Sequence, residues 1–291
     1  MERDNLRGTV LMVVSMALFA LEDVVLKLAA AQMPVGQVLV IFGAFGLTGF
    51  ALMVRGRGQR LLDPAMLSPA LALRALGEAI GRLGYTLAIA LTPLASASAI
   101  LQATPLVVVL GAALVFGERV GWRRILAVLG GFAGVLIILR PGLDGFMPAS
   151  LWAVFGMFGL ALRDLATRAA PPALSHLQLG FWGFAVLLPT GAAMLAVTGG
   201  AVVPSAGIVV TLALGAVVGV AAYTAVIAAM RTGEIAAVTP FRYSRILFAI
   251  VLGILVFGEW PDGMTLAGAS VVVGCGIYTV LRERRLARER R

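Results

Sequence analysis

The chain has 291 residues, of which 60% are hydrophobic and only 13% charged, whereas soluble domains carry about 25% charged residues. The formal net charge of +9 would suit a nucleic-acid partner, but the basic residues cluster in short segments between apolar stretches, which argues against nucleic acid. Cys275 is the only cysteine and His176 the only histidine, which excludes disulfides, His-clustered zinc sites and Ser-His-Asp catalysis of the usual kind; no cofactor or enzyme activity is expected.

Ten apolar stretches fill the chain almost from end to end. Each is close to the 20 or so residues that a helix needs to cross roughly 30 Å of hydrocarbon. They lie at 8–31, 35–54, 69–91, 95–116, 122–139, 148–170, 176–198, 205–229, 235–257 and 263–281. Charged residues interrupt the first stretch, so we expect it to be retained and not cleaved as a signal peptide. We therefore predict an all-α integral membrane protein with ten transmembrane helices.

The arginines between the stretches predict an orientation. If the N-terminus is cytoplasmic, Arg140 alone faces the opposite side. The cytoplasmic segments then hold 15 arginines: Arg3, Arg7, Arg55, Arg57, Arg60, Arg119, Arg123, Arg124, Arg231, Arg282, Arg284, Arg285, Arg288, Arg290 and Arg291. This positive-inside bias predicts a multi-pass protein of a bacterial-type inner membrane with both termini cytoplasmic, and a basic tail that touches anionic lipid.

The second half of the chain repeats the first at an offset of 141 residues. Leu114 to Glu118 falls on Leu255 to Glu259, and Asp23 with Lys27 falls on Asp164 with Arg168. Each copy holds five stretches, so the copies must cross the membrane in opposite directions. We predict two inverted five-helix repeats, 1–141 and 142–282, followed by a basic tail, 283–291. Inverted repeats are typical of secondary transporters, whose substrate site lies between the halves.

These features resemble a known family. The two boxes Gly117-Glu118 and Gly258-Glu259, the proline in the fourth stretch and the Gly-rich fifth are similar to those of the drug/metabolite transporter superfamily, specifically EamA-type metabolite exporters. The resemblance covers the whole chain and is closest to amino-acid exporters of the YddG kind. It implies a central cavity formed mainly by spans 1–4 and 6–9, with spans 5 and 10 outside. In agreement, residues 125–139 of span 5 and 265–281 of span 10 contain no charged residue and are rich in glycine, including Gly130-xxx-Gly134, which favours close helix packing.

Charged residues inside the other spans are the candidate substrate ligands, because each costs at least about 2.5 kcal/mol at the bilayer centre. Arg74, Glu78, Arg82 and Tyr85 share one face of the third span. One interpretation is a ladder in which Glu78 neutralises either arginine while Arg74 snorkels to the interface. The other is that Arg82, which lies deeper, binds a substrate carboxylate.

Arg242 and Arg245 share a face of the ninth span and are absent from the first copy of the repeat. They either recognise an anionic substrate or form a bridge with Glu78 that closes one end of the cavity.

Asp23 and Asp164 each have a basic residue four positions on, Lys27 and Arg168, which favours structural pairing within one helix. Proton coupling through one of the two carboxylates is the alternative. Glu118 and Glu259 are expected to cap or link helices.

Pro105 and Pro240 interrupt helical patterns and predict kinks, whose freed carbonyls Gln102 and Ser244 could bind. An aromatic chamber is expected from Tyr85, Trp182, Tyr223 and Tyr243. Ordinary packing is the alternative interpretation for the prolines and the aromatic residues alike.

The spans hold seven basic and four acidic residues, and this excess favours a substrate that carries a carboxylate. The leading hypothesis is a secondary transporter that exports amino acids, aromatic or apolar, or related small metabolites by alternating access. A sugar-phosphate, nucleotide-sugar or drug exchanger of the same superfamily is the alternative, and an intramembrane enzyme or scaffold is the hypothesis from another class. Membrane lipid and the small-molecule substrate are the expected partners; the oligomeric state stays open.

Overall fold

The computed structural model of the chain describes residues 2–117, 121–232 and 238–289. Within these ranges every regular element is helical, and no strand occurs. The helices are α1 (Glu2–Ala30), α2 (Val35–Gly56), α3 (Pro69–Leu91), α4 (Leu94–Leu101), α5 (Thr104–Phe116), α6 (Trp122–Leu139), α7 (Leu151–Arg168), α8 (His176–Thr198), α9 (Ala206–Thr232), α11 (Ser244–Phe257) and α12 (Gly263–Glu289). Three 3₁₀ segments accompany them: η1 (Pro64–Leu67), η2 (Pro148–Ser150) and η3 (Thr239–Tyr243). The all-helical prediction is confirmed for these residues.

Eight helical segments are long and apolar enough to cross a membrane. One combines α4 with α5, and another combines η3 with α11. Helix α6 adds a shorter apolar stretch, Ile125–Leu139, and α3 is 23 residues long but carries three charged residues. The chain is therefore a multi-pass membrane protein.

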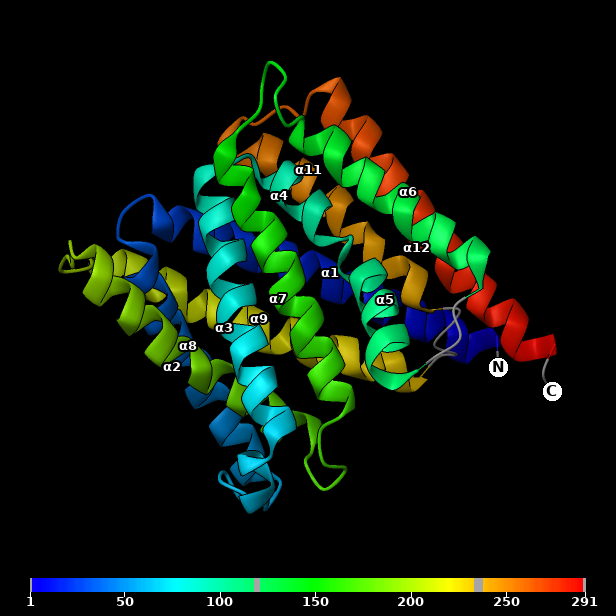
Figure 1. Ribbon diagram of the computed structural model, residues 1–291. Coiled ribbons are helices and arrows are strands. Elements are labelled where there is room, and N and C mark those ends of the chain that lie inside the picture. Colours follow the sequence, from blue (N-terminus) through cyan, green and yellow to red (C-terminus); the bar gives the residue numbers. More distant parts are fainter. Residues whose placement is uncertain (1, 118–120, 233–237, 290–291) are drawn as a thin grey trace.

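Four helix pairs make the most extensive contacts, and each joins a helix before residue 141 to one after it. The pairs are α1 with α9, α2 with α8, α3 with α7, and α6 with α12. Figure 1 shows α3 beside α7, and α6 beside α12 along one flank of the bundle. The first and second halves of the chain are therefore interleaved.

The ends of the chain mark one side of the bundle. N and C lie close together in Figure 1, and the 140–147 connection lies at the opposite end. Because successive spans alternate in direction, the connections at 31–34, 92–93, 199–205 and 258–262 share the side of 140–147. We call this the distal side, and the side of the chain ends the terminal side. On the distal side Arg140 donates to Asp262 and lowers the pKa of that carboxyl to about 2.

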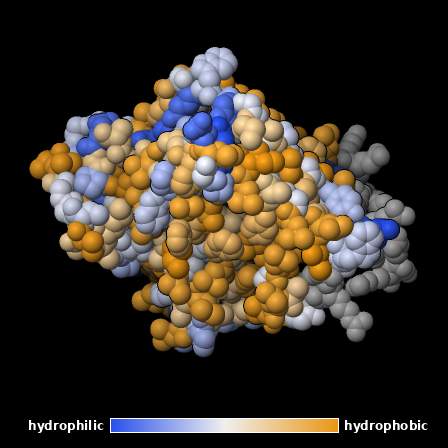
Figure 2. Space-filling model, turned by 45° about the horizontal axis from the view of Figure 1, so that its top comes forward, coloured by the Kyte–Doolittle hydropathy of each residue, from blue (hydrophilic) through white to orange (hydrophobic). Residues whose placement is uncertain are grey.

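Hydrophobic side chains cover much of the surface between the two sides. Figure 2 shows a broad hydrophobic area on one face, with hydrophilic residues gathered mainly toward one edge. Exposed leucines are frequent on α6, including Leu126, Leu129 and Leu136. Such a surface suits hydrocarbon and would be unusually large for a soluble monomer.

Glycines allow the paired helices to approach closely. A Cβ atom on Gly36 of α2 would lie 2.6 Å from the carbonyl oxygen of Gly191 on α8. A Cβ atom on Gly134 of α6 would lie 2.8 Å from the carbonyl oxygen of Gly268 on α12. The close packing predicted for the fifth span is therefore confirmed, with α12 as its partner.

Replacing Gly159 by valine is expected to prevent stable folding. A Cβ atom at this position would lie 2.3 Å from the backbone nitrogen and 2.7 Å from the Cα of Gly81, so α3 and α7 would have to separate. Overpacking of this kind costs about 3 kcal/mol or more. Yield and thermal unfolding in detergent measure the effect. Gly274→Val is the control, because no atom lies within 4 Å of a Cβ there; equal unfolding temperatures for both variants would contradict the prediction.

The backbone conformation explains the glycine in each of the two Gly-Glu boxes. Helices α5 and α11 end at Gly117 and Gly258, whose φ angles are 66° and 67°. Glycine adopts this left-handed conformation without the steric cost that other residues meet, and it commonly ends helices. The repeated glycine therefore marks the same helix end in both halves. Glu118 lies outside the described residues.

The predicted break at Pro105 is confirmed: α4 ends at Leu101, and α5 begins at Thr104. Pro240 lies in the 3₁₀ segment η3, directly before α11. The two prolines do not align at the offset of 141, but α11 begins within one residue of the position equivalent to the start of α5. In both halves a regular α-helix therefore begins again at equivalent positions of the repeat. Helix α12 continues to Glu289, so most of the predicted basic tail extends the last helix.

Candidate substrate site

Charged side chains from α1, α3, α7 and α11 converge between the two halves of the chain. We call this group the central network; it comprises Glu22, Asp23, Glu78, Asp164, Arg74, Arg82, Arg163 and Arg245. Four carboxylates meet four guanidinium groups, so the ionised network carries no net charge. Charges inside a membrane protein normally face its interior and pair with one another, which lowers the cost of burying them.

Glu78 is the centre of the larger part of this network. Its carboxylate accepts a hydrogen bond of 3.3 Å from Arg82 Nε and lies 3.8 Å from Arg74 and 3.7 Å from Arg163. The ladder predicted along α3 is therefore confirmed, and Arg163 of α7 adds a contact that the sequence did not predict. The predicted bridge from Glu78 to Arg242 or Arg245 is wrong, because Arg245 is held by another carboxylate.

Arg82 and Arg74 are both held inside the bundle. Arg82 binds Glu22 at 2.6 Å in addition to Glu78, and its guanidinium lies 5.8 Å from the centre of the Phe184 ring. A substrate carboxylate at Arg82 would therefore have to displace a protein carboxylate. Arg74 does not snorkel as predicted: its side chain is buried, and its Nε donates to Thr167 Oγ1 at 3.0 Å.

The remaining part of the network joins Asp23 of α1 to Arg245 of α11. Arg245 Nη2 lies 2.8 Å from both carboxylate oxygens, and the Tyr85 hydroxyl donates to Asp23 at 2.9 Å. Tyr85 also shares a 3.0 Å hydrogen bond with Ser98 of α4, and its ring lies under the Arg245 guanidinium. The structure thus brings Asp23, Tyr85 and Arg245 together in one buried constellation.

Pairing within one helix was the wrong prediction for Asp23 and Lys27. Asp23 points toward α11, whereas the longer Lys27 reaches the distal side, where its Nζ lies 2.5 Å from Glu259 Oε1. Asp164 likewise pairs with Arg163, its chain neighbour, at 2.8 Å. The guanidinium of Arg168 lies 5.2 Å from the centre of the Phe116 ring. Asp23 therefore pairs with a residue of another helix, and Asp164 with its neighbour on the same helix, instead of with the residue four positions on.

Lys27 and Glu259 form a connection that we call the distal lock, together with Thr92 and Leu94. Lys27 also donates to the Thr92 carbonyl at 2.7 Å, and Glu259 accepts from the Leu94 backbone N–H at 2.8 Å. Glu259 therefore caps the N-terminus of α4, where a negative charge is favourable. Glu259 was expected to cap or link helices, and it does both: it caps α4 and links to α1, two helices of the other half of the chain. The lock holds α1, α4 and the end of α11 together on the distal side.

The predicted aromatic chamber is formed only in part, since Tyr85 and Tyr223 lie at the central network but Trp182 and Tyr243 do not. Trp182 packs in a separate cluster with Met66, Leu71, Leu174 and Leu179, and Tyr243 is buried against Gly276 of α12. Tyr223 lies edge-on to Phe50, with ring centres 5.3 Å apart. The aromatic ring beside Arg82 is Phe184, and the buried rings of Phe42 and Phe50 pack against it; the sequence did not single out these three phenylalanines.

Gln102 and Ser244 bind carbonyls at the irregular points of the helices, as one interpretation predicted. Gln102 Nε2 donates to the Arg242 carbonyl at 2.9 Å, and Ser244 Oγ donates to the Phe241 carbonyl at 2.7 Å. Gln102 thereby ties the break between α4 and α5 to η3. Arg242 joins this link through its backbone, and it is Arg245 that joins the central network.

Within the described residues, no group of three His, Cys, Asp or Glu side chains is arranged to hold a metal ion. The candidate site is an ion-pair network with a buried phenylalanine cluster, Phe42, Phe50 and Phe184, beside it.

Comparison with known proteins identifies relatives among transporters. One is the S-adenosylmethionine uptake transporter of Rickettsia bellii, 23% identical over 213 residues, which are 73% of this chain and 72% of that protein. Another is the riboflavin transporter of Rhizobium johnstonii, 27% identical over 216 residues, or 74% of this chain and 71% of that protein. A third is the pseudopaline exporter CntI of Pseudomonas aeruginosa, 29% identical over 173 residues, or 55% of this chain and 58% of that protein. None of these three is named as an amino-acid exporter of the YddG kind.

A solved crystal structure shares the fold, with a TM-score of 0.60 at 20% identity over 96% of this chain and 98% of the other. The sequence profile of the EamA-like transporter family matches the chain twice, at residues 6–140 and 147–282. The chain therefore belongs to the EamA-like transporter family.

Proposed function

We propose that this chain exports amino acids, or small metabolites that contain an amino-acid group, across a bacterial-type inner membrane. Transport proceeds by alternating access between two inverted five-helix repeats, 1–141 and 142–282, of which the second continues into the basic tail 283–291. The ten spans comprise α1, α2, α3, α4 with α5, α6, α7, α8, α9, η3 with α11, and α12. The substrate binds at the central network, between the halves.

The observation that carries the proposal is the buried pair between Asp23 of the first half and Arg245 of the second. The pair must open when the halves separate, and each partner would then be a desolvated, unpaired charge. An amino-acid zwitterion offers a carboxylate to Arg245 and an ammonium group to Asp23. It replaces the pair without leaving either charge unmatched, whereas an anion or a cation satisfies only one of them.

The balance of the central network supports a zwitterion as well. The sequence indicated an excess of basic residues, but Glu259 neutralises Lys27, and Arg242 contacts Gln102 through its backbone carbonyl. A substrate without net charge preserves the balance of four carboxylates and four guanidinium groups. A sugar phosphate would add negative charge that no unmatched arginine of the network compensates.

Of the substrates named for the relatives, S-adenosylmethionine contains an amino-acid group and riboflavin does not. The amino-acid group of S-adenosylmethionine supports binding at the pair of Asp23 and Arg245, whereas its sulfonium gives the molecule a net positive charge, so the argument from neutrality applies to simple amino acids. A riboflavin-like substrate is the second candidate, because a flat aromatic ring could pack on the phenylalanine cluster beside Arg82 once the halves separate.

Uptake by purified protein in liposomes tests the function. We expect counterflow of at least one labelled amino acid or S-adenosylmethionine, compared with protein-free liposomes. Riboflavin exchange without exchange of any amino-acid compound would establish the second candidate instead. Absence of all three would contradict both.

Labelling of introduced cysteines tests the proposed orientation, which places both termini in the cytoplasm. On a Cys275→Ala background, we expect a membrane-impermeant maleimide added outside to modify Gly145→Cys and to leave Gly58→Cys unmodified, because positive loops stay inside. Permeabilised cells are the control, in which both positions should react. Modification of position 58 from outside, with none at 145, would contradict the orientation.

A further inference from the structure

The terminal ends of α6 and α12 enclose an open groove of about 420 Å³ on the outside of the bundle. It is lined by Trp122, Arg123, Leu126, Ala127, Gly274, Cys275 and Tyr278. A second recess of about 300 Å³ is lined by Arg123, Tyr278, Leu281 and Arg282. Arg123 and Tyr278 line both, so the two recesses are neighbours, and together we call them the groove. It lies on α6 and α12, two helices that contribute no residue to the central network.

The groove exists because the two helices are in tight contact on the distal side and separate toward the terminal side. At Gly134 and Gly268 the backbones approach so closely that a Cβ atom would clash. At Gly274, by contrast, a Cβ atom would have no neighbour within 4 Å. Small residues, Ala127, Gly274 and Cys275, therefore leave a slot between the helices that no side chain of the described residues fills.

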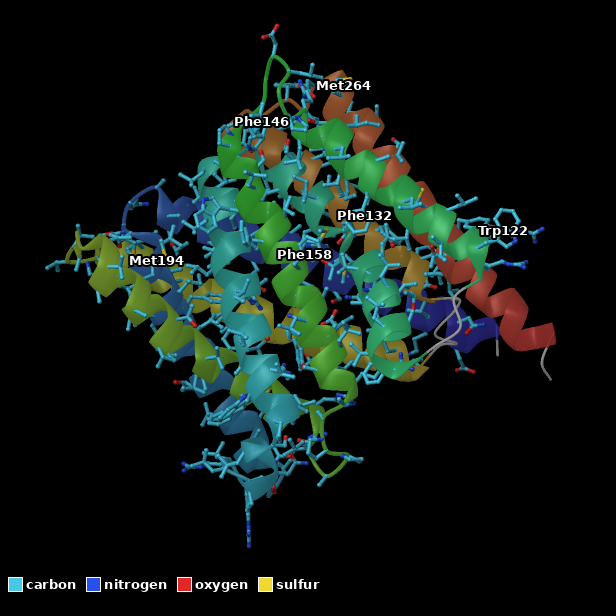
Figure 3. The ribbon with its side chains drawn as sticks, in the orientation of Figure 1. Trp122, Phe132, Phe146, Phe158, Met194 and Met264 are labelled. Carbon is cyan, nitrogen blue, oxygen red and sulfur yellow. The ribbon has the colours of Figure 1, made fainter. Side chains whose placement is uncertain are left out.

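The slot is apolar along its floor and basic at its rim. Leu126 and Leu281 are exposed beside it, and Arg123 and Arg282 both line its terminal part. The Arg123 guanidinium lies 5.2 Å from the centre of the Trp122 ring. Figure 3 shows Trp122 at the terminal end of α6, projecting away from the bundle. Tryptophan is typical of the level at which the hydrocarbon meets the head groups.

We propose that this groove is a binding site for one anionic phospholipid of the leaflet on the terminal side. The phosphate binds between Arg123 and Arg282, within reach of the Tyr278 hydroxyl, and an acyl chain occupies the slot over Ala127 and Gly274. A lipid fits better than a soluble anion because the groove opens on a surface rich in exposed leucines. Basic recesses between membrane helices on the cytoplasmic side are suited to acidic head groups, and the proposed orientation puts this groove there. The lipid site itself does not depend on which substrate is carried.

Cys275 provides a direct readout, because it is the only cysteine and lines the groove. The rate of maleimide labelling is measured on the full chain in a neutral detergent with added phosphatidylglycerol or phosphatidylcholine. We expect phosphatidylglycerol to slow the labelling several-fold at concentrations where phosphatidylcholine has little effect. Glycerol 1-phosphate, which has the head-group charge without acyl chains, should not protect.

The variant R123Q/R282Q should abolish the difference between the two lipids, whereas R57Q, in an exposed loop of the same side, should retain it. Quenching of Trp122 by brominated phosphatidylglycerol, in a chain whose other three tryptophans are phenylalanine, provides a second measurement that does not use the thiol. Equal protection by both lipids, or unchanged protection in R123Q/R282Q, would overturn the proposal. Protection by glycerol 1-phosphate would assign the site to a soluble anion. If R123Q/R282Q were misfolded, its Cys275 would be labelled fast even without lipid. The single variant R282Q would then replace it, and the difference in protection between the two lipids would be compared with that of R57Q.

Discussion

Neutralising Asp23 and Arg245 together is expected to leave the protein folded while abolishing transport of zwitterionic substrates. Neutralising only one of the two residues should in addition lower the free energy of unfolding, because the other charge is then buried without a partner. Such a loss costs about 3–5 kcal/mol, whereas removal of both charges is often nearly neutral. The comparison therefore separates the scaffold role of the pair from its role in binding.

The variants D23N, R245Q and D23N/R245Q are compared by thermal unfolding in detergent and by counterflow in liposomes. A hydrogen bond to a charged group is worth about 1.5–3 kcal/mol, so the loss of substrate affinity in the double variant should be about tenfold or more. The control is R140Q/D262N, which removes an ion pair of the distal side that lies outside the central network. A folded D23N/R245Q protein that transports at the original rate would show that the pair only stabilises the bundle.

Replacing Glu259 by glutamine is expected to open the distal side. The substitution removes the ion pair with Lys27 and weakens the cap on α4, while the side chain keeps its size. Buried ion pairs that break and form again can bias an element with two stable arrangements. In an alternating-access transporter, loss of a lock on one side should shift the population toward the state that is open there.

Distances between spin labels at Gln32→Cys and Trp260→Cys, on a Cys275→Ala background, measure this shift. Both positions are exposed, one just after α1 and the other just after α11. We expect one dominant short distance with Glu259 and a second, longer population with Glu259→Gln. Arg140→Gln, which breaks a different distal ion pair, should retain the short distance. An identical distribution in all three proteins, together with active transport, would show that the lock does not gate access.

Hydropathy predicted the helices well, because the membrane requires each span to be long, apolar and internally hydrogen-bonded. The predicted stretches 69–91, 122–139 and 176–198 coincide with α3, α6 and α8. The repeated Gly-Glu boxes located the ends of α5 and α11. The first and last helices extend beyond their predicted stretches, since helix formation in polar terminal segments leaves no hydropathy signal.

The partners of the charged residues could not be predicted in the same way. Helical periodicity shows that Asp23 and Lys27 share a face, but it does not show which helix lies opposite that face. In the structure Asp23 pairs with Arg245, and Lys27 pairs with Glu259. One signal was available: Lys27 and Glu259 have opposite charges and lie at span ends on the same side.

The aromatic residues illustrate the same limit. Tyrosine and tryptophan were singled out because they are amphipathic, yet Trp182 and Tyr243 pack away from the central network. Phe42 and Phe50 are eight residues apart and so share one face of α2, a spacing that the sequence did contain. Phenylalanine is common in all apolar spans, however, and only the packing of α2 against α8 brings Phe184 to the same place.

Competition by single-charge analogues tests the central claim most directly. Counterflow of the amino acid that is carried best is measured against its methyl ester, which lacks the carboxylate, and against its desamino acid, which lacks the ammonium group. If the substrate replaces the pair between Asp23 and Arg245, the complete zwitterion should compete strongly and each analogue should be weaker by about tenfold or more, since each leaves one buried charge without a partner. Equal competition by all three compounds would contradict the account.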